Sequence, residues 1–244
     1  MRPIDIINVA GLLMDGNGDG IEEELREEVE PRFLRTIAPT PISSVMEHPA
    51  HAIERAVLMI RKAVQDIEQQ FGEPNVLLVG RSYGAFVALL AAIRMNFQKI
   101  SKAILIEGPL HPDVSVKPPL LLPPLMACGI HYKARPTLAR EAVESLRKLG
   151  TSRLVVVQGG GEDEVVPTAS QIIPGDFETI ELSSDTLRRI HTGDSKRGLV
   201  IKLPPHIGGR DGGMKRLLPD GYLNHLFWSK GKMEMIRKII VKMR

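Results

Sequence analysis

The pattern of apolar and polar residues divides the chain into alternating short strands and helices. Residues 49–71 give the clearest helical pattern, because apolar side chains recur three and four positions apart and Gly72 ends the run. Further helices are expected at residues 21–30, 85–95, 137–149, around 222–228 and at the carboxyl terminus. Short apolar runs predict strands at residues 4–9, 32–37, 76–79, 103–106, 154–158, 177–182 and 199–203.

This alternation of strands and helices predicts an α/β fold. Strands that are joined through helices pair in parallel, so we expect a mostly parallel sheet of about six to seven strands with helices on both faces. The chain has 244 residues and shows no internal repeat and no sign of a second domain. Residues 1–244 are therefore expected to form a single domain with a full-sized core.

The most informative stretch follows the strand at residues 76–79. It reads Gly80-Arg81-Ser82-Tyr83-Gly84 and leads into an Ala/Leu-rich helix. In so tight a turn, glycines are needed where a Cβ atom would collide with the strand or the helix. The start of the helix supplies backbone N–H groups and a partial positive charge where an oxyanion would form. A surface Gly-Ser-Gly turn is the alternative, but such a turn seldom lies between a Val/Leu strand and an Ala/Leu helix.

The order of strand, Gly80-x-Ser82-x-Gly84 and helix resembles the nucleophile elbow of the α/β-hydrolase superfamily, in its serine esterase and lipase-like members. The succession of elements is similar to the core of that family from its third strand onward, so the resemblance covers nearly the whole chain. It implies an α/β-hydrolase fold of the small form, without a large cap domain. A short Pro-rich, lid-like segment at residues 109–136 would stand in the place of the cap.

The resemblance also implies a catalytic triad in the order Ser, acid, His. Ser82 is the expected nucleophile. The expected acid is Asp163, which follows the strand at 154–158 and a Gly-rich turn in Asp-x-x-Val-Pro, although Glu162 and Glu164 beside it leave open which carboxylate faces inward. A serine hydroxyl becomes a good nucleophile only when a base takes its proton and an acid orients that base.

Two histidines compete for the role of base. His206 lies in the loop that follows the strand at 199–203, as the resemblance requires for the last core strand. His191 is closer to Asp163 in sequence, but a segment that reads as a helical turn separates it from the strand before it. We therefore prefer His206 and keep His191 as the alternative, while His225 looks helical and structural.

An oxyanion hole needs two backbone N–H donors. The resemblance implies that one is Tyr83, the residue after the nucleophile. The other is expected at Leu12, in the loop after the first strand, where Ala10-Gly11 replaces the His-Gly that the family usually carries. Because the donating group is a backbone N–H, the side chain at this position need not match.

The same loop carries a rival signal. Asp15, Asn17 and Asp19, with Gly20 after them, resemble the start of an EF-hand calcium loop. The twelfth position is Arg26 instead of a bidentate glutamate, so affinity for calcium would be poor. We expect a flexible turn before an acidic helix here, and neither a metal nor a cofactor.

Composition narrows the classes of partner. The net charge of +3 and the aromatic content of 4% give no basic cluster with interleaved aromatics, so nucleic-acid binding is not expected. No apolar run approaches the roughly 18–20 residues of a membrane span. The single cysteine, Cys128, cannot form an internal disulfide. Asp5 and Asn8 interrupt any signal-peptide core, so a cytoplasmic location is expected.

Taken together, these patterns favour a serine hydrolase that cleaves carboxylic esters through an acyl-enzyme, with a small acyl ester as its substrate. The Pro/Leu-rich stretch at residues 116–126 could form an apolar rim for an acyl chain or simply a stiff connector. A thioesterase or an acyltransferase would use the same triad. A protein of this fold that binds a ligand without catalysis is the third hypothesis, since a fold does not determine a function.

Overall fold

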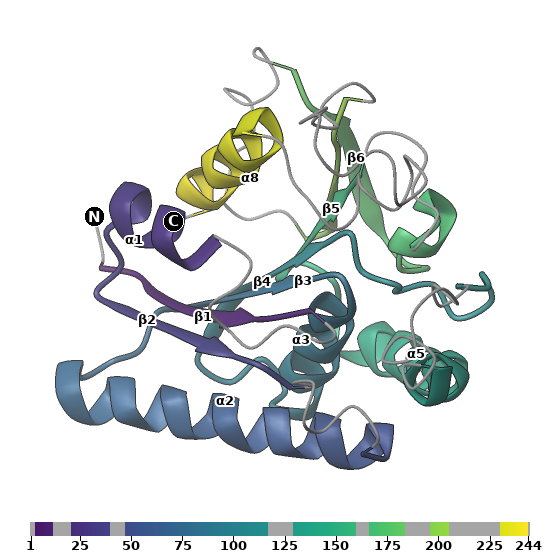
Figure 1. Ribbon diagram of the computed structural model, residues 1–244, viewed down its shortest axis with the longest axis horizontal. Coiled ribbons are helices and arrows are strands. Elements are labelled where there is room, and N and C mark those ends of the chain that lie inside the picture. The colour runs from purple at the N-terminus through teal and green to yellow at the C-terminus, as the bar shows by residue number, and fades with distance from the viewer. Residues whose placement is uncertain are drawn as a thin grey trace, which may run out of the picture.

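The computed structural model describes residues 3–11, 21–39, 47–116, 129–159, 166–183, 196–204 and 230–243. Within these residues, seven strands form one sheet in the order β2-β1-β3-β4-β5-β7-β6, and every neighbouring pair is parallel (Figure 1). The strands are β1 (Asp5–Val9), β2 (Phe33–Ile37), β3 (Val76–Arg81), β4 (Ile100–Ile106), β5 (Leu154–Gln158), β6 (Phe177–Glu181) and β7 (Gly198–Lys202). The α/β fold with a parallel sheet is confirmed.

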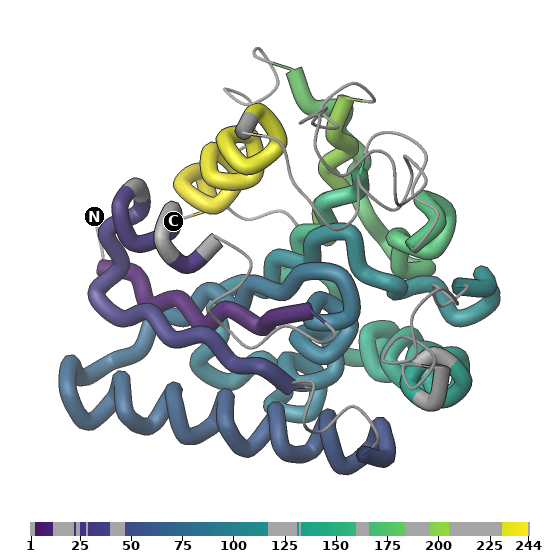
Figure 2. The backbone as a smooth tube through the Cα atoms, in the orientation of Figure 1, coloured from purple at the N-terminus to yellow at the C-terminus, as the bar shows by residue number. Residues whose placement is uncertain are grey.

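Helices cover both faces of this sheet, as expected. One face carries α2 (Pro49–Phe71), α3 (Tyr83–Arg94) and α5 (Gly129–Leu149). The other face carries α1 (Ile21–Val29) and α8 (Lys230–Lys242), which come from opposite ends of the chain and lie side by side (Figure 2). A short 3-10 helix, η2 (Thr168–Gln171), follows β5 and was not predicted from the sequence.

The core consists of two apolar layers because side chains alternate between the faces of each strand. Leu78 of β3 belongs to the layer under α2, α3 and α5, whereas Leu77 and Val79 belong to the layer under α1 and α8. Every residue of β1, β3 and β5 is buried. The outer strands β2 and β6 are partly exposed, which is the pattern of a sheet with a buried centre and two edges.

The bounds of α2 and β5 match the prediction residue for residue, and most of the other elements begin and end within two residues of the expected positions. The helix expected at 137–149 is an exception, because α5 begins at Gly129 and continues through Pro136. Proline normally ends a helix, since it lacks an N–H and its ring meets the preceding turn. Here the buried side chains of His131 and Arg135 hold the first turns of α5 against the core. The helix expected around 222–228 lies outside the described residues.

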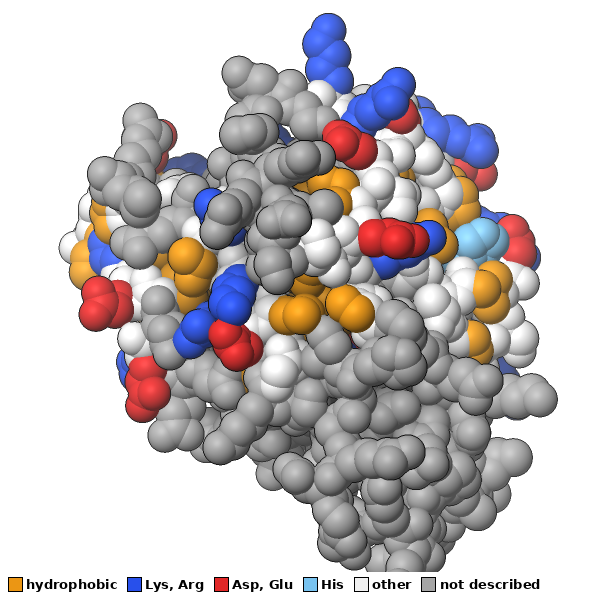
Figure 3. Space-filling model, turned by 90° about the horizontal axis from the view of Figure 1, so that it is seen from above, with side chains coloured by type: hydrophobic (Ala, Val, Ile, Leu, Met, Phe, Trp, Pro, Cys, Tyr) orange, Lys and Arg blue, Asp and Glu red, His pale blue; other side chains and the backbone are white. Residues whose placement is uncertain are grey.

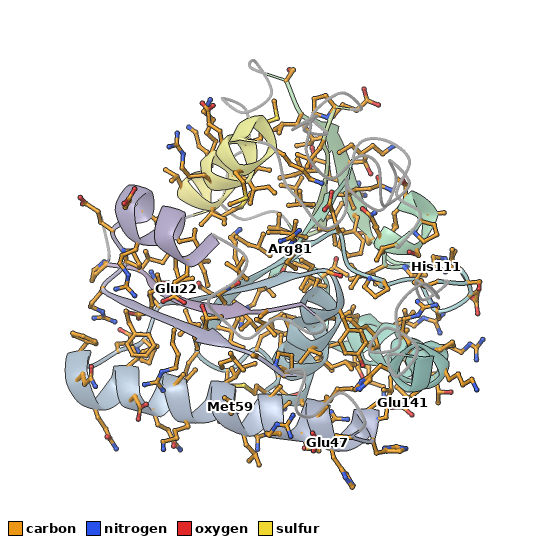
Figure 4. All side chains as sticks on the ribbon, in the orientation of Figure 1. Glu22, Glu47, Met59, Arg81, His111 and Glu141 are labelled. Atoms are coloured by element: carbon orange, nitrogen blue, oxygen red, sulfur yellow. The ribbon has the colours of Figure 1, made fainter. Side chains whose placement is uncertain are left out.

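Arg135 joins α5 to the chain that leaves β4. Its side chain is 2% exposed and donates hydrogen bonds to the carbonyl oxygens of Pro109, His111 and Val114. The backbone N–H of His111 also donates to the carbonyl of Ser170 in η2, at 2.8 Å. Figure 4 shows His111 on this stretch, on the side of the molecule where α5 lies. The described ends of the expected lid-like segment are therefore bound to the core, while residues 117–128 lie outside the described ranges.

A partly buried ion pair joins elements at the amino end of the sheet. Asp5 is fully buried at the start of β1, and its two carboxylate oxygens accept from Nε and Nη2 of Arg32 at 2.9 and 2.7 Å. The backbone N–H of Asn75, just before β3, donates to the same carboxylate at 2.9 Å. The hydrogen bond to Asp5 raises the pKa of the Arg32 guanidinium above its usual value. This pair fixes the start of three neighbouring strands.

The surface of the described residues carries both signs of charge. Figure 3 views the molecule from above Figure 1, and basic and acidic side chains are interspersed over the described part of that face. Among the described helices, none is both long enough and apolar enough to cross a membrane.

Candidate active site

Ser82 lies in the turn between β3 and α3, at the carboxyl edge of the sheet. Its backbone has φ +53° and ψ −130°, a left-handed conformation that is rare for a residue with a side chain. The turn is held from both sides, because the Ser82 N–H donates to the Ile106 carbonyl at 2.9 Å and its carbonyl accepts from Ala85 N–H at 3.0 Å. The strand, turn and helix predicted around Ser82 are confirmed, and strain of this kind is typical of functional sites.

The two glycines of the motif are required by close backbone approach. A Cβ on Gly80 would lie 2.6 Å from the Gly84 carbonyl oxygen and 2.7 Å from the Ala85 Cα atom. A Cβ on Gly84 would collide with the carbonyl oxygens of Val9 and Ala10 at the end of β1. The absence of a side chain at Gly80 allows α3 to turn back over β3. Its absence at Gly84 allows α3 to pack against the end of β1.

Tyr83 is the first residue of α3, so its N–H belongs to the amides at the positive end of the helix. Its side chain is fully buried, and its hydroxyl lies 3.2 Å from Nδ1 of His131. The two rings also stack edge to face, with centroids 5.3 Å apart. This contact joins the residue after Ser82 to the first turns of α5, which the sequence did not reveal.

The chain toward Leu12 leaves the sheet beside α3. β1 ends at Val9, the Ala10 N–H donates to the Ile37 carbonyl at 2.9 Å, and both the Val9 and Ala10 carbonyls face Gly84. Leu12 itself lies outside the described residues.

The two ends of the loop that carries Asp163 are held together. Gln171 of η2 is fully buried, and its Oε1 accepts from Gly159 N–H at 2.7 Å while its Nε2 donates to the Val166 carbonyl at 2.7 Å. One side-chain amide thus bridges the two ends of the loop at residues 160–165. Asp163, with its acidic neighbours, lies outside the described residues, so the structure does not test which carboxylate faces inward.

The chain toward His206 leaves the sheet next to that loop. β7 pairs directly with β5, with Lys202 opposite Gln158, and the Leu203 N–H donates to the Gln158 carbonyl at 2.9 Å. The strand before His191, β6, is the outer strand and pairs with β7 alone. Both histidines, and His225, lie outside the described residues.

Comparison with known proteins gives no match among protein-family models or curated sequences. Solved structures do match. The chain is similar to carboxyl esterase 2 from the mycorrhizal fungus Tuber melanosporum, with a TM-score of 0.58 and 13% identity over 98% of this chain and 78% of that chain. It is also similar to an esterase domain from Rhodothermus marinus, with a TM-score of 0.50 and 10% identity over 99% of this chain and 86% of that chain.

The protein has an α/β-hydrolase fold. The resemblance drawn from the sequence is confirmed at the level of the fold, and identities this low establish no more than that. Within the α/β-hydrolase fold, Ser82 and the chain ends that lead to Leu12, Asp163 and His206 all lie at the carboxyl ends of parallel strands, where ligands bind in open α/β sheets.

Sequence reasoning missed a buried charged pair at this edge of the hydrolase fold. Glu107 follows β4 directly, with its side chain 2% exposed, and forms an ion pair with Lys232 of α8, whose side chain is 9% exposed. An acidic residue directly after a buried apolar strand was the signal in the sequence that could have drawn attention to it. Arg81 is also buried here, on the face that α1 and α8 cover (Figure 4).

The described part of the hydrolase fold holds no cluster of three or more His, Cys, Asp or Glu side chains that could bind a metal ion. The calcium-like stretch from Asp15 to Asp19 lies outside it. A cavity of about 380 Å³ opens at the far end of α3, lined by residues that include Arg61, Glu68 and Lys99. The length of α3, about 18 Å, separates it from Ser82, so it is not part of the candidate active site.

Proposed function

We propose that the protein is a serine hydrolase that cleaves carboxylic esters through an acyl-enzyme, with Ser82 as the nucleophile. The observation that carries this proposal is the strained turn at Ser82, where the glycines at positions 80 and 84 are sterically required and α3 begins at the next residue. A surface turn has no need of such close backbone contacts or of a left-handed serine. The esterases with a similar fold support the same class of reaction.

In this proposal, His206 takes the proton of Ser82 as the Ser82 oxygen attacks the ester carbonyl carbon. The backbone N–H groups of Tyr83 and Leu12 stabilise the resulting oxyanion. The carbon–oxygen bond to the alcohol then breaks, and His206 gives its proton to the departing alcohol. Water repeats the sequence on the acyl-enzyme and releases the carboxylic acid and free Ser82. Asp163 orients His206 throughout.

The strand order supports His206 over His191 as the base. The chain to His206 leaves β7 beside Gln158, from which the Asp163 loop also departs, and His206 is the third residue after Leu203. His191, by contrast, comes ten residues after Glu181, the last residue of the outer strand β6. A short tether beside the acid loop limits how far a base can lie from its acid.

The test is labelling with a fluorophosphonate, followed by intact-mass detection, alongside hydrolysis of p-nitrophenyl butyrate. We expect a single adduct on the native chain, its loss in Ser82→Ala, and a fall in hydrolysis of about 10⁴-fold or more in Ser82→Ala and His206→Ala. Ser145→Ala is the matched control, since that hydroxyl donates to the Glu141 carbonyl on α5 and should leave labelling unchanged.

The other histidine variants make the test specific. Loss of labelling in His191→Ala or His225→Ala, with His206→Ala unaffected, would move the role of base to that residue. A folded native chain that neither labels nor hydrolyses the ester would contradict the hydrolase proposal and favour a binding role. A thioesterase would instead prefer acyl thioesters, and an acyltransferase would give a new ester when an alcohol competes with water.

A further inference from the structure

The carboxylate of Glu107 lies where three parts of the candidate active site meet. The next residue, Gly108, packs against the Ser82 turn so closely that a Cβ on it would lie 3.2 Å from the Ser82 carbonyl oxygen. A Cβ on Gly159, the first residue after β5, would collide with Oε1 of Glu107. That same Oε1 pairs with Lys232 of α8. The Glu107 side chain thus lies next to the Ser82 turn. It contacts the start of the loop that carries Asp163 and also contacts α8, the helix that follows the segment with His206.

Both the backbone conformation and the burial of Glu107 are energetically unfavourable. Glu107 has φ +48°, in the left-handed region that residues with a side chain rarely adopt, and its N–H donates to the Val157 carbonyl at 2.9 Å. Its charge and that of Lys232 are both withdrawn from water, and burying an ion pair often stabilises a fold no better than apolar residues of similar volume would. Strain and buried charge that stability alone does not explain are characteristic of functional sites.

The ends of the segment that carries His206 are both fixed at this edge. At its start, Leu203 is hydrogen-bonded to the end of β5. At its end, Lys232 lies in the first turn of α8 and is held by Glu107. Removal of the ion pair therefore weakens the second of these anchors and leaves the first in place.

We propose that Glu107 is a positioning residue, whose carboxylate, paired with Lys232, holds the acid loop and α8 in register with Ser82. This inference rests on the proposed function, because the register matters only if the acid and base of a triad are carried by those segments. Glu107 does not itself touch the substrate. It acts through the chain segments that it contacts.

The test compares Glu107→Gln, Lys232→Met and the double variant Glu107→Gln/Lys232→Met with the native chain. Each single variant removes one charge of the buried ion pair and leaves the other, so we expect a lower melting temperature and a kcat for p-nitrophenyl butyrate that falls about 10- to 100-fold. The KM should stay within about twofold, since ground-state binding is not the contact that is lost. The double variant removes both charges of the pair, so its melting temperature should recover while kcat stays low.

The Asp5–Arg32 pair provides a matched control at the opposite end of the sheet. Asp5→Asn should lower the melting temperature in the same way and leave kcat unchanged. Recovery of kcat together with the melting temperature in the double variant would overturn the positioning role, as would an unchanged kcat in all three variants. Failure of the proposed function is distinguishable from these outcomes, because it appears in the native chain as an absence of Ser82 labelling. That result would overturn the positioning role as well.

Discussion

At the scale of single residues, the space around the backbone selects the amino acids of the Ser82 turn. Gly84 has no side chain at the point where α3 passes the end of β1, and the carbonyl oxygens of Val9 and Ala10 occupy the place that a Cβ would take. Ser82 keeps a left-handed backbone although serine gains nothing from it locally. The turn therefore exists because β3, α3 and β1 are pressed together, and it carries a hydroxyl at the edge where they meet.

The variant Gly84→Ala tests whether close packing of α3 against β1 requires a glycine at this position. The added methyl group must push α3 away from β1, so we expect the free energy of unfolding to fall by about 1–3 kcal/mol. Because Ser82 is two residues away, fluorophosphonate labelling should slow about tenfold or more. Gly150→Ala is the control: Gly150 has φ +78° with open space around its Cβ position, so alanine there should lower stability without slowing labelling. Equal labelling rates in the two variants would contradict the steric argument.

At the scale of elements, η2 organises the loop on which the acid is expected. Four residues of 3-10 helix bring the Gln171 amide between Gly159 and Val166, and the carbonyl of Ser170 accepts the N–H groups of Leu110 and His111. The loop after β5 is thus tied both to itself and to the chain after β4. An element this short left no periodic signal in the sequence, and its role depends on contacts with residues distant along the chain.

Gln171→Met removes the bridge but keeps the volume. It removes the hydrogen bonds that the Gln171 amide makes to the Gly159 N–H and the Val166 carbonyl, so stability should fall by about 1–3 kcal/mol. Because the two ends of the loop that carries Asp163 are then no longer held together, hydrolysis of p-nitrophenyl butyrate should slow about tenfold or more. Circular dichroism melting and steady-state kinetics check both effects, and Gln65→Met on the exposed face of α2 should change neither. Full activity in a destabilised Gln171→Met would show that the bridge serves stability alone.

At the scale of the whole molecule, the sheet has a rigid centre and two weaker edges. β3 is buried throughout and pairs with β1 on one side and β4 on the other. β6 pairs only with β7, and most of its side chains are partly or fully exposed. The candidate nucleophile therefore follows the best-supported strand, and only the alternative base, His191, follows the outermost strand β6.

Hydrogen exchange measured by mass spectrometry tests this gradient. Amides of β3 should exchange only on global unfolding, whereas amides of β6 should exchange about 100-fold faster or more through local opening. The strand β7, which is paired on both sides, provides an internal control next to β6 and should behave like the centre. Equal protection of β6 and β3 would mean that the sheet opens as one cooperative unit.

The sequence by itself determined most of the elements, the class of fold and the turn that carries Ser82. These features depend on local properties: the period of apolar residues along a helix or strand, the alternation of the two, and the glycine spacing of a tight turn. For that reason the bounds of α2 and β5 were predicted residue for residue. The assignments of Asp163, His206, Leu12 and the alternative His191 lie outside the described residues and stay predictions.

Only the tertiary structure decided which of these elements lie together. It set β7 between β5 and β6, carried α5 through Pro136, bridged a loop with Gln171 and paired Glu107 with Lys232 across more than a hundred residues. The physical reason is that each of these features depends on contacts with residues outside its own element, which no periodic pattern along the chain specifies. Local propensity opposes some of them, as with a proline inside a helix or a glutamate at positive φ, and only the packing of the folded chain makes them favourable.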